Sequence, residues 1–68
     1  MYNWVIVLIN YTNGVTASAR IKTDTENKDM ALRLCCQATK FNMEDVEEVV
    51  YYLVDPWVYY GKEKFNVS

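Results

Sequence analysis

Carboxylates are concentrated in one short stretch of the chain, where Glu44, Asp45, Glu47 and Glu48 lie within residues 44–48. Paired carboxylates can hold Mg²⁺ or act as general acid and base when a cleft perturbs their pKa values. A chain this short offers little depth for a cleft. The simpler interpretation is a solvated loop that enters a strand and forms an acidic rim able to steer a basic partner. We therefore expect neither an enzyme nor a metal or cofactor site.

Thiol chemistry is restricted to Cys35 and Cys36, which are neighbours in the sequence. Adjacent helical residues point about 100° apart, so a disulfide between them would need unusual backbone geometry. We expect both to be reduced, with Cys35 packed as a small buried hydrophobe. The chain has no histidine, which excludes a Ser-His-Asp triad, a Cys-His dyad and any His-dependent zinc site.

Length and charge narrow the remaining possibilities. The 68 residues predict a single domain, residues 1–68. A net charge of −2 removes the usual electrostatic argument for nucleic acid binding. The longest apolar run, residues 4–9, is too short to span a membrane and lacks the pattern of a signal peptide. We expect a cytoplasmic protein (in the host cell if the source is viral) with no membrane partner.

Two strands and a tight turn are predicted at the N-terminal end. Residues 2–11 are rich in β-branched and aromatic side chains on both alternating faces, which is typical of a central strand. Asn13-Gly14 follows and favours a two-residue type I′ hairpin into residues 15–22. That turn would pair Thr12 with Val15, and it implies the further pairs Asn10 with Ala17, Leu8 with Ala19 and Ile6 with Ile21.

One amphipathic helix is predicted to begin near residues 25–28 and to run for about fourteen residues. Thr23, Thr25 and Asn27 are alternative N-caps. Side chains at three- and four-residue spacing form one apolar stripe: Met30, Ala31, Leu34, Cys35, Ala38 and Phe41. The opposite side carries Lys28, Arg33, Gln37 and Lys40.

A third strand is predicted over residues 46–54, and Asp55-Pro56 ends it because proline donates no ladder hydrogen bond. Residues 57–60 form either a short fourth edge strand or a packed tail, and residues 61–68 form a polar end that frays. The fold class is α+β: a small single-layer antiparallel sheet, β-β-α-β with a possible fourth short strand, order 2-1-3, and one helix packed on one face.

Such a sheet has more apolar surface than one helix can cover. Trp4, Ile6 and Leu8 share a face with Val15, Ala17, Ala19 and Ile21, and we expect this face to receive the helix. The opposite face holds Val5, Val7, Ile9 and Tyr11 beside Thr16, Ser18, Arg20 and Lys22. Three covers are possible: a second copy of the chain, a different macromolecule, or the C-terminal aromatics Trp57, Tyr59, Tyr60 and Phe65.

The leading hypothesis is a non-catalytic protein-interaction module whose partner is another protein or a second copy of itself. Its candidate partner-binding residues are Val5, Val7, Ile9, Tyr11, Arg20, Tyr52, Trp57 and Tyr59. One alternative is single-stranded nucleic acid binding through Tyr11, Arg20 and Lys22, which the negative total charge disfavours. The other alternative is a purely structural homodimer.

The order strand, hairpin, strand, capped helix, strand is similar in layout to small phage proteins that bind and inhibit host enzymes, such as the RNA polymerase inhibitors of T7-like phages. The resemblance covers the order of elements and no shared motif, so it transfers no site residue. What it implies is a phage or mobile-element modulator of a host enzyme.

Overall fold

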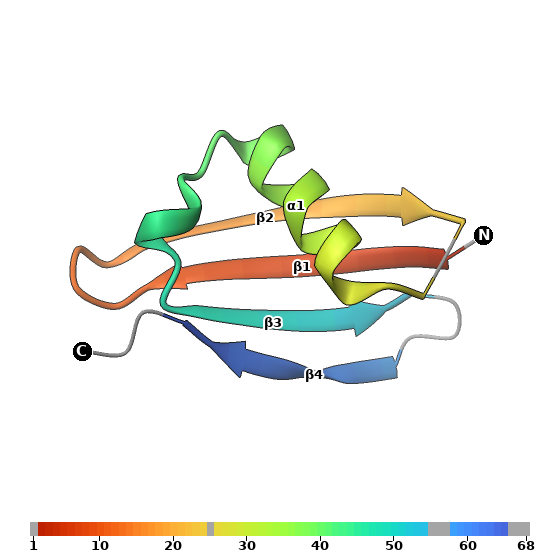
Figure 1. Ribbon diagram of the computed structural model, residues 1–68. Helices are drawn as coiled ribbons and strands as arrows, with labels where there is room; N and C mark the ends of the chain where they lie inside the picture. The colour runs from red at the N-terminus through yellow and green to blue at the C-terminus, as the bar shows by residue number, and fades with distance from the viewer. Residues whose placement is uncertain (1, 25, 55–57, 66–68) are drawn as a thin grey trace.

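The computed structural model describes residues 2–24, 26–54 and 58–65, which form four strands, one α-helix and one short 3₁₀ helix (Figure 1). The elements are β1 (Tyr2–Asn10), β2 (Val15–Thr23), α1 (Lys28–Thr39), η1 (Met43–Asp45), β3 (Glu48–Leu53) and β4 (Val58–Lys64). All neighbouring strands are antiparallel, in the order β2-β1-β3-β4, and α1 packs on one face. The predicted fold class, the order 2-1-3 and the possible fourth strand are confirmed.

The central place of β1 follows from the connection between β2 and β3. Both strands pair antiparallel to β1, so they run parallel to each other and need a crossover between them. Helix α1 makes that crossover above the sheet (Figure 1). The Glu47 amide donates to the Ile9 carbonyl at 2.9 Å and the Val54 amide to the Asn3 carbonyl at 2.8 Å, which adds a hydrogen bond at each end of the β1–β3 pairing.

The hairpin between β1 and β2 differs from the prediction. Its turn spans four residues, 11–14, and the last strand pair is Asn10 with Val15. Leu8 therefore pairs with Ala17, Ile6 with Ala19 and Trp4 with Ile21. The predicted two-residue turn is wrong, but the register moves by two residues, which leaves every side chain on its predicted face.

Side-chain hydrogen bonds explain the longer turn. The Asn10 side-chain oxygen accepts from the Asn13 amide at 2.9 Å, and its Nδ2 donates to the Asp45 carbonyl at 2.6 Å. The Glu47 carboxylate accepts from the amides of Tyr11 and Thr12 and, at 2.8 Å, from the Thr12 hydroxyl. The turn is thus held by residues that come just before β3 in the sequence. The local preference of the dipeptide Asn13-Gly14 does not include these contacts.

Helix α1 is shorter than predicted, and the side that it buries against the sheet differs from the predicted apolar stripe. Asn27 is the N-cap, and its side chain accepts from the amides of Asp29 and Met30. The helix ends at Thr39, because Lys40 adopts a left-handed conformation with φ 58°. Its buried residues are Ala31, Leu32 and Cys35, whereas two members of the predicted stripe, Met30 and Ala38, are exposed.

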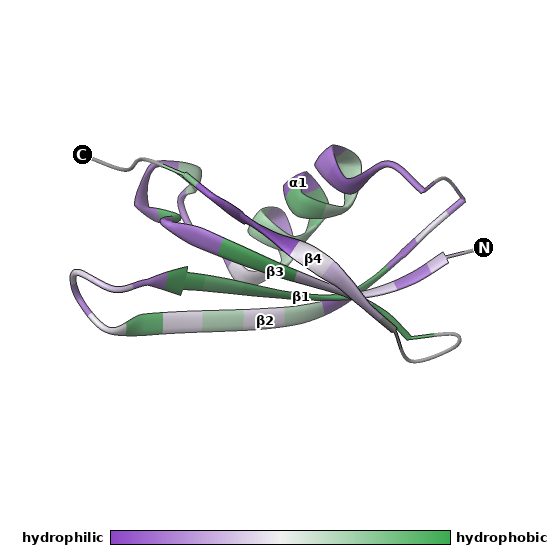
Figure 2. Ribbon diagram, turned by 90° about the horizontal axis from the view of Figure 1, so that it is seen from below, coloured by the Kyte–Doolittle hydropathy of each residue, from purple (hydrophilic) through white to green (hydrophobic). Residues whose placement is uncertain are grey.

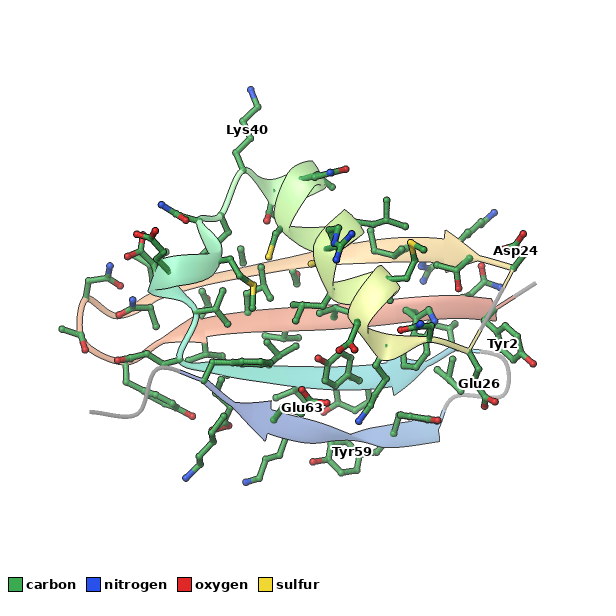
Figure 3. All side chains as sticks on the ribbon, in the orientation of Figure 1. Tyr2, Asp24, Glu26, Lys40, Tyr59 and Glu63 are labelled. Atoms are coloured by element: carbon green, nitrogen blue, oxygen red, sulfur yellow. The ribbon has the colours of Figure 1, made fainter. Side chains whose placement is uncertain are left out.

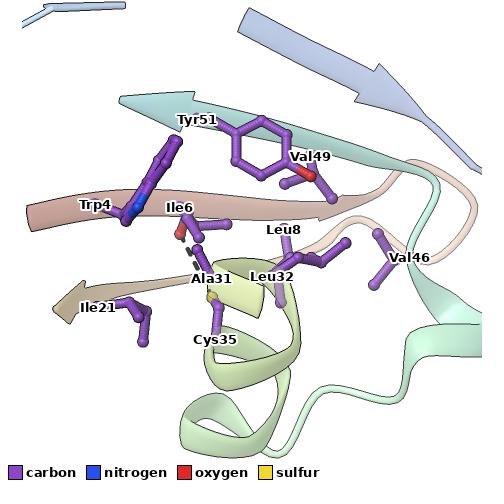
Figure 4. Packing of buried hydrophobic residues seen from close by; sticks show 10 residues of the cluster. All are labelled: Trp4, Ile6, Leu8, Ile21, Ala31, Leu32, Cys35, Val46, Val49 and Tyr51. Carbon is purple, nitrogen blue, oxygen red and sulfur yellow. Dashed lines mark hydrogen bonds between the residues drawn. The ribbon is translucent and has the colours of Figure 1, made fainter. Parts of the chain in front are cut away.

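The core lies between α1 and one face of the sheet (Figure 4). Its buried side chains come from β1, β2, β3 and α1, and one comes from the segment between η1 and β3. They are Trp4, Ile6, Leu8, Ile21, Ala31, Leu32, Cys35, Val46, Val49 and Tyr51. Trp4 meets Tyr51 edge to face at 6.0 Å between ring centroids. Of the two possible faces for the third strand, the one with Val49 and Tyr51 packs against the helix.

Strand β4 replaces part of the predicted tail. Residues 61–64 belong to the strand, and they pair with β3 from Tyr51↔Gly61 to Glu48↔Lys64. A register irregularity opposite Tyr51 and Tyr52 leaves Tyr60 as an extra residue, whose ring lies 5.0 Å from that of Trp4. The prediction of a frayed end from residue 61 is therefore wrong for residues 61–64, and residues 66–68 lie outside the described chain.

Removing the negative charge of the carboxylate that holds the turn should weaken the fold in a pH-dependent way. The hydrogen bond from the Thr12 side chain lowers the pKa of Glu47 from its ordinary value of 4.5. A lowered folded-state pKa gives stability that is present above the ordinary pKa and is lost as the pH falls through the folded value. We expect Glu47→Gln to lower the urea midpoint at pH 7 and the deficit to shrink at about pH 3.

The matched control is Asp24→Asn, which removes an exposed carboxylate beyond the far end of β2. Its urea midpoint should change little between the two pH values. Circular dichroism follows both unfolding curves. A Glu47→Gln deficit that is the same at pH 7 and at about pH 3 would contradict the role assigned to this carboxylate.

Candidate binding face

The sheet has one side without a helix among the described residues, and we call it the open face. Figure 2 shows the sheet with α1 on one side only. Strand register places the side chains of this face in three rows across the sheet. The rows are Arg20–Val5–Tyr52–Tyr59, Ser18–Val7–Val50–Lys62 and Thr16–Ile9–Glu48–Lys64.

The middle of the open face is aliphatic. Val5, Val7 and Ile9 come from β1 and Val50 from β3, the two central strands. Each of the four is only partly buried, whereas the alternate residues of β1, such as Ile6 and Leu8, are fully buried under the helix. These four side chains form an apolar stripe parallel to the strands, with no described element above it.

Cations line both edges of the stripe. Arg20 and Lys22 extend from the edge strand β2, and Lys62 and Lys64 from the edge strand β4, and all four are exposed. In Figure 3, Glu63 and Tyr59 are labelled on opposite sides of the β4 ribbon, because the extra residue Tyr60 shifts the alternation by one. Lys62 and Lys64 flank Glu63, so alternation places them on the side opposite to Glu63. Glu63 forms an ion pair of 2.9 Å with Lys28 on the helix side.

Three tyrosines lie at the ends of the open face. The rings of Tyr52 and Tyr59 meet edge to face at 5.4 Å, and Tyr59 is 54% exposed. Tyr11, in the turn beyond Ile9, donates its hydroxyl to the Glu48 carboxylate at 3.1 Å. That hydrogen bond raises the pKa of Tyr11 and directs the ring toward the β3 side of the face.

The structure brings most of the predicted partner-binding residues together. Val5, Val7, Ile9, Arg20, Tyr52 and Tyr59 share the open face and Tyr11 borders it, whereas Trp57 lies outside the described residues. The sequence leaves open whether Val49 or Val50 lies on this face, and sequence reasoning missed Lys62 and Lys64. The alternation Lys62-Glu63-Lys64 is a strand signal, but the extra residue Tyr60 breaks its continuity with residues 57–60.

The C-terminal aromatics do not cover the open face in the way that one of the three alternatives required. Tyr60 packs against Trp4 on the helix side, and Phe65 packs against the core. Tyr59 alone among the described members of that set lies on the open face, and it is at the edge. The internal cover is therefore wrong for Tyr60 and Phe65, and the apolar stripe remains accessible in the described chain.

The acidic cluster is used mainly to hold structure. Glu47 binds the β1–β2 turn and Glu48 binds Tyr11, while Asp45 contributes its backbone carbonyl to Asn10. Glu44 and Asp45 are exposed in η1. Within residues 2–24, 26–54 and 58–65, no three His, Cys, Asp or Glu side chains are grouped closely enough to hold a metal ion.

The two thiols are free, and they lie on the helix side. Cys35 is fully buried, as predicted, and its Sγ donates to the Ile6 carbonyl at 3.8 Å. Burial raises the pKa of Cys35 to about 11. Cys36 borders a surface pocket of about 280 Å³ with Asp29, Arg33, Leu32, Met43 and Phe65, and burial raises its pKa too. Both are protonated at neutral pH and therefore poor nucleophiles.

The same polar substitution should lower the free energy of unfolding more on the helix side of β3 than on its open face. Val49 is fully buried on the helix side and its neighbour Val50 is partly exposed on the open face. We expect Val49→Thr, which buries a hydroxyl, to lower the free energy of unfolding by about 1–3 kcal/mol. Val50→Thr should cost less than about 0.5 kcal/mol, as surface substitutions do.

Urea unfolding followed by circular dichroism measures both values. Equal losses for the two variants would mean that Val50 is covered in solution. That outcome would remove the open face as a candidate site.

No helix in the described part of the chain is both long and apolar enough to cross a membrane. A scan against protein-family models, a search of curated proteins and a search of solved structures each found no match to this chain.

Proposed function

We propose that this protein is a non-catalytic interaction module that binds another protein through its open face. The observation that carries this proposal is the aliphatic stripe on the central strands, which no described element covers and which cations border on both sides. Apolar patches rimmed by polar residues commonly mark macromolecular interaction sites, because burying them on a partner removes apolar area from water.

The shape of this face favours a macromolecule over a small ligand. Small-molecule sites are concave and enclose most of their ligand, with a few converging polar groups. Here the aliphatic side chains lie along a single sheet layer, in a domain that is only 16 Å across its shortest axis. An extended apolar surface on a sheet is matched by another protein surface.

Charge favours a different protein over a second copy of this chain. A symmetric dimer through the open face would bring together Arg20, Lys22, Lys62 and Lys64 from both copies, against one carboxylate, Glu48, from each. Like charges that face each other across an interface cost free energy. A heterologous partner avoids this repulsion.

The wider role that fits these features is a modulator of a host enzyme from a phage or a mobile element, acting in the host cytoplasm. Support comes from the small size, the uncovered apolar stripe of the described open face and the layout similar to small phage inhibitors. Such a protein needs no chemistry of its own, because occupying a surface of the enzyme is enough to alter its activity.

The test compares wild type with variants on the two sides of the sheet. Val7→Asp places a charge in the aliphatic stripe, Tyr52→Ser removes a ring from the open face, and Ala38→Asp adds a charge on the exposed side of α1. Each tagged protein is used for affinity capture from cells of its source, with quantitative mass spectrometry. The purified captured protein is then titrated by calorimetry.

We expect a partner that wild type and Ala38→Asp bind alike, with affinity reduced by about tenfold or more for Val7→Asp and Tyr52→Ser. Circular dichroism checks that the variants are folded, and Tyr52→Ser provides the test if Val7→Asp is not. Capture that is unaffected by both open-face variants would refute the proposal. So would a dimer in light scattering that Tyr52→Ser dissociates.

A further inference from the structure

The apolar stripe of the open face has a defined length and width, which limit what can bind there; this inference rests on the proposed function. From Val5 to Ile9 the stripe covers four steps along β1, or about 13 Å at the rise of a strand. The four strands are spaced about 4.8 Å apart, so the two cationic edge strands lie about 14 Å from each other.

An α-helix fits this strip. A helix with its side chains is about 10–12 Å wide, so a helix that lies on β1 and β3 fits within the distance between the two edge strands. At 1.5 Å per residue, about nine residues of helix extend along the stripe, and they present two or three turns of apolar side chains. Proteins that recognise an amphipathic helix contact its apolar face, with anchors at i, i+3, i+4 and i+7.

The position of the cations indicates which charges the two borders of such a helix should carry. Arg20 and Lys22 lie on one edge of the strip, and Lys62 and Lys64 on the other, so both borders of the bound helix face positive charge. We infer that the open face binds an amphipathic α-helix of a partner protein, whose apolar stripe is bordered on both sides by Asp or Glu.

The distribution of charge over the molecule supports this orientation. The open face carries four cations and one carboxylate, although the whole chain has a net charge of −2. The remaining described surface is acidic and includes Asp24, Glu26, Asp29 and Glu44. An acidic helix is therefore attracted to the open face and repelled by the rest, which favours productive encounter.

Single-stranded nucleic acid matches this face less well, although the local charge suits phosphate. Binding of single strands relies on aromatic side chains on which bases stack. The middle of this face is aliphatic, and the ring of Tyr52 is packed edge to face against Tyr59. Glu48, at the end of the stripe, is buried and accepts the Tyr11 hydroxyl, so it offers a phosphate backbone no favourable contact.

The experiment uses designed probes and the whole chain. The first probe is a labelled peptide of about 18 residues, long enough to form a helix, with a leucine stripe bordered by glutamates. The second is the same peptide with every glutamate replaced by lysine. The third is a labelled oligodeoxythymidine of about 15 nucleotides. Fluorescence anisotropy gives the affinity of each at low and at moderate salt.

Two charge-reversal variants are matched in charge and differ in location. Arg20→Glu/Lys62→Glu changes one cation on each edge of the open face, and Arg33→Glu/Lys40→Glu changes two exposed cations on and after α1. We expect wild type to bind the glutamate peptide at least about tenfold more tightly than the lysine peptide or the oligonucleotide. The open-face pair should weaken that binding about tenfold, and the α1 pair should not.

Added salt should reduce the affinity of wild type for the glutamate peptide. The inference is overturned if the two peptides bind equally, if the oligonucleotide binds most tightly, or if both charge-reversal pairs have the same effect. If the glutamate peptide does not bind while partner capture still depends on Tyr52, the acidic helix is wrong and the proposed function stands. If capture is also independent of Tyr52, both fail.

Discussion

A sheet has two faces, and the described part of this chain has one α-helix, of twelve residues, which packs on one of them. That constraint determines most of what the structure shows. Trp4, Ile6 and Leu8 of the central strand are withdrawn from water by α1, and they form the core with Val49 and Tyr51 of β3. Val5, Val7 and Ile9 of β1 and Val50 of β3 lie on the other face of the same two strands; they are also aliphatic, and the described chain leaves them partly exposed. Because burial of apolar area is the main favourable term in folding and in association, the same strands that build the core also create a surface suited to a partner.

The acidic cluster shows how the same residue types can serve chemistry or structure. Four carboxylates within five positions could suggest metal binding or acid–base catalysis. In the folded chain, Glu47 instead accepts hydrogen bonds from the turn between β1 and β2, and Glu48 holds the hydroxyl of Tyr11. These bonds tie the turn to the entry of β3 and so fix one end of the open face. A carboxylate committed to backbone amides is stabilised in its charged form, which is the opposite of what a general acid requires.

The elements could be predicted largely from local patterns, and the departures have physical reasons. The β-branched run of β1 and the Asn27 cap follow from signals within a few residues of each other, and the order of strands follows from the crossover that the helix makes between β2 and β3. The turn was predicted two residues too short, because the contacts that widen it come from Glu47, far along the chain. The rotation of α1, which buries Leu32 and exposes Met30, depends on which side chains fit against the sheet. Strand β4 was predicted too short because the irregularity at Tyr60 interrupts the alternation.

The sequence by itself determined the fold class, the central place of β1 and the excess of apolar residues over what one helix can cover, because hydrophobic periodicity is a local property. It excluded histidine chemistry by composition alone. Only the tertiary structure decided how charge is distributed. A net charge of −2 argued against a nucleic acid partner, yet four of the seven cations lie on the open face. Strand register brings Arg20 and Lys62, distant in sequence, to opposite edges of one apolar stripe, and register is set by pairing between strands that no single stretch of sequence encodes.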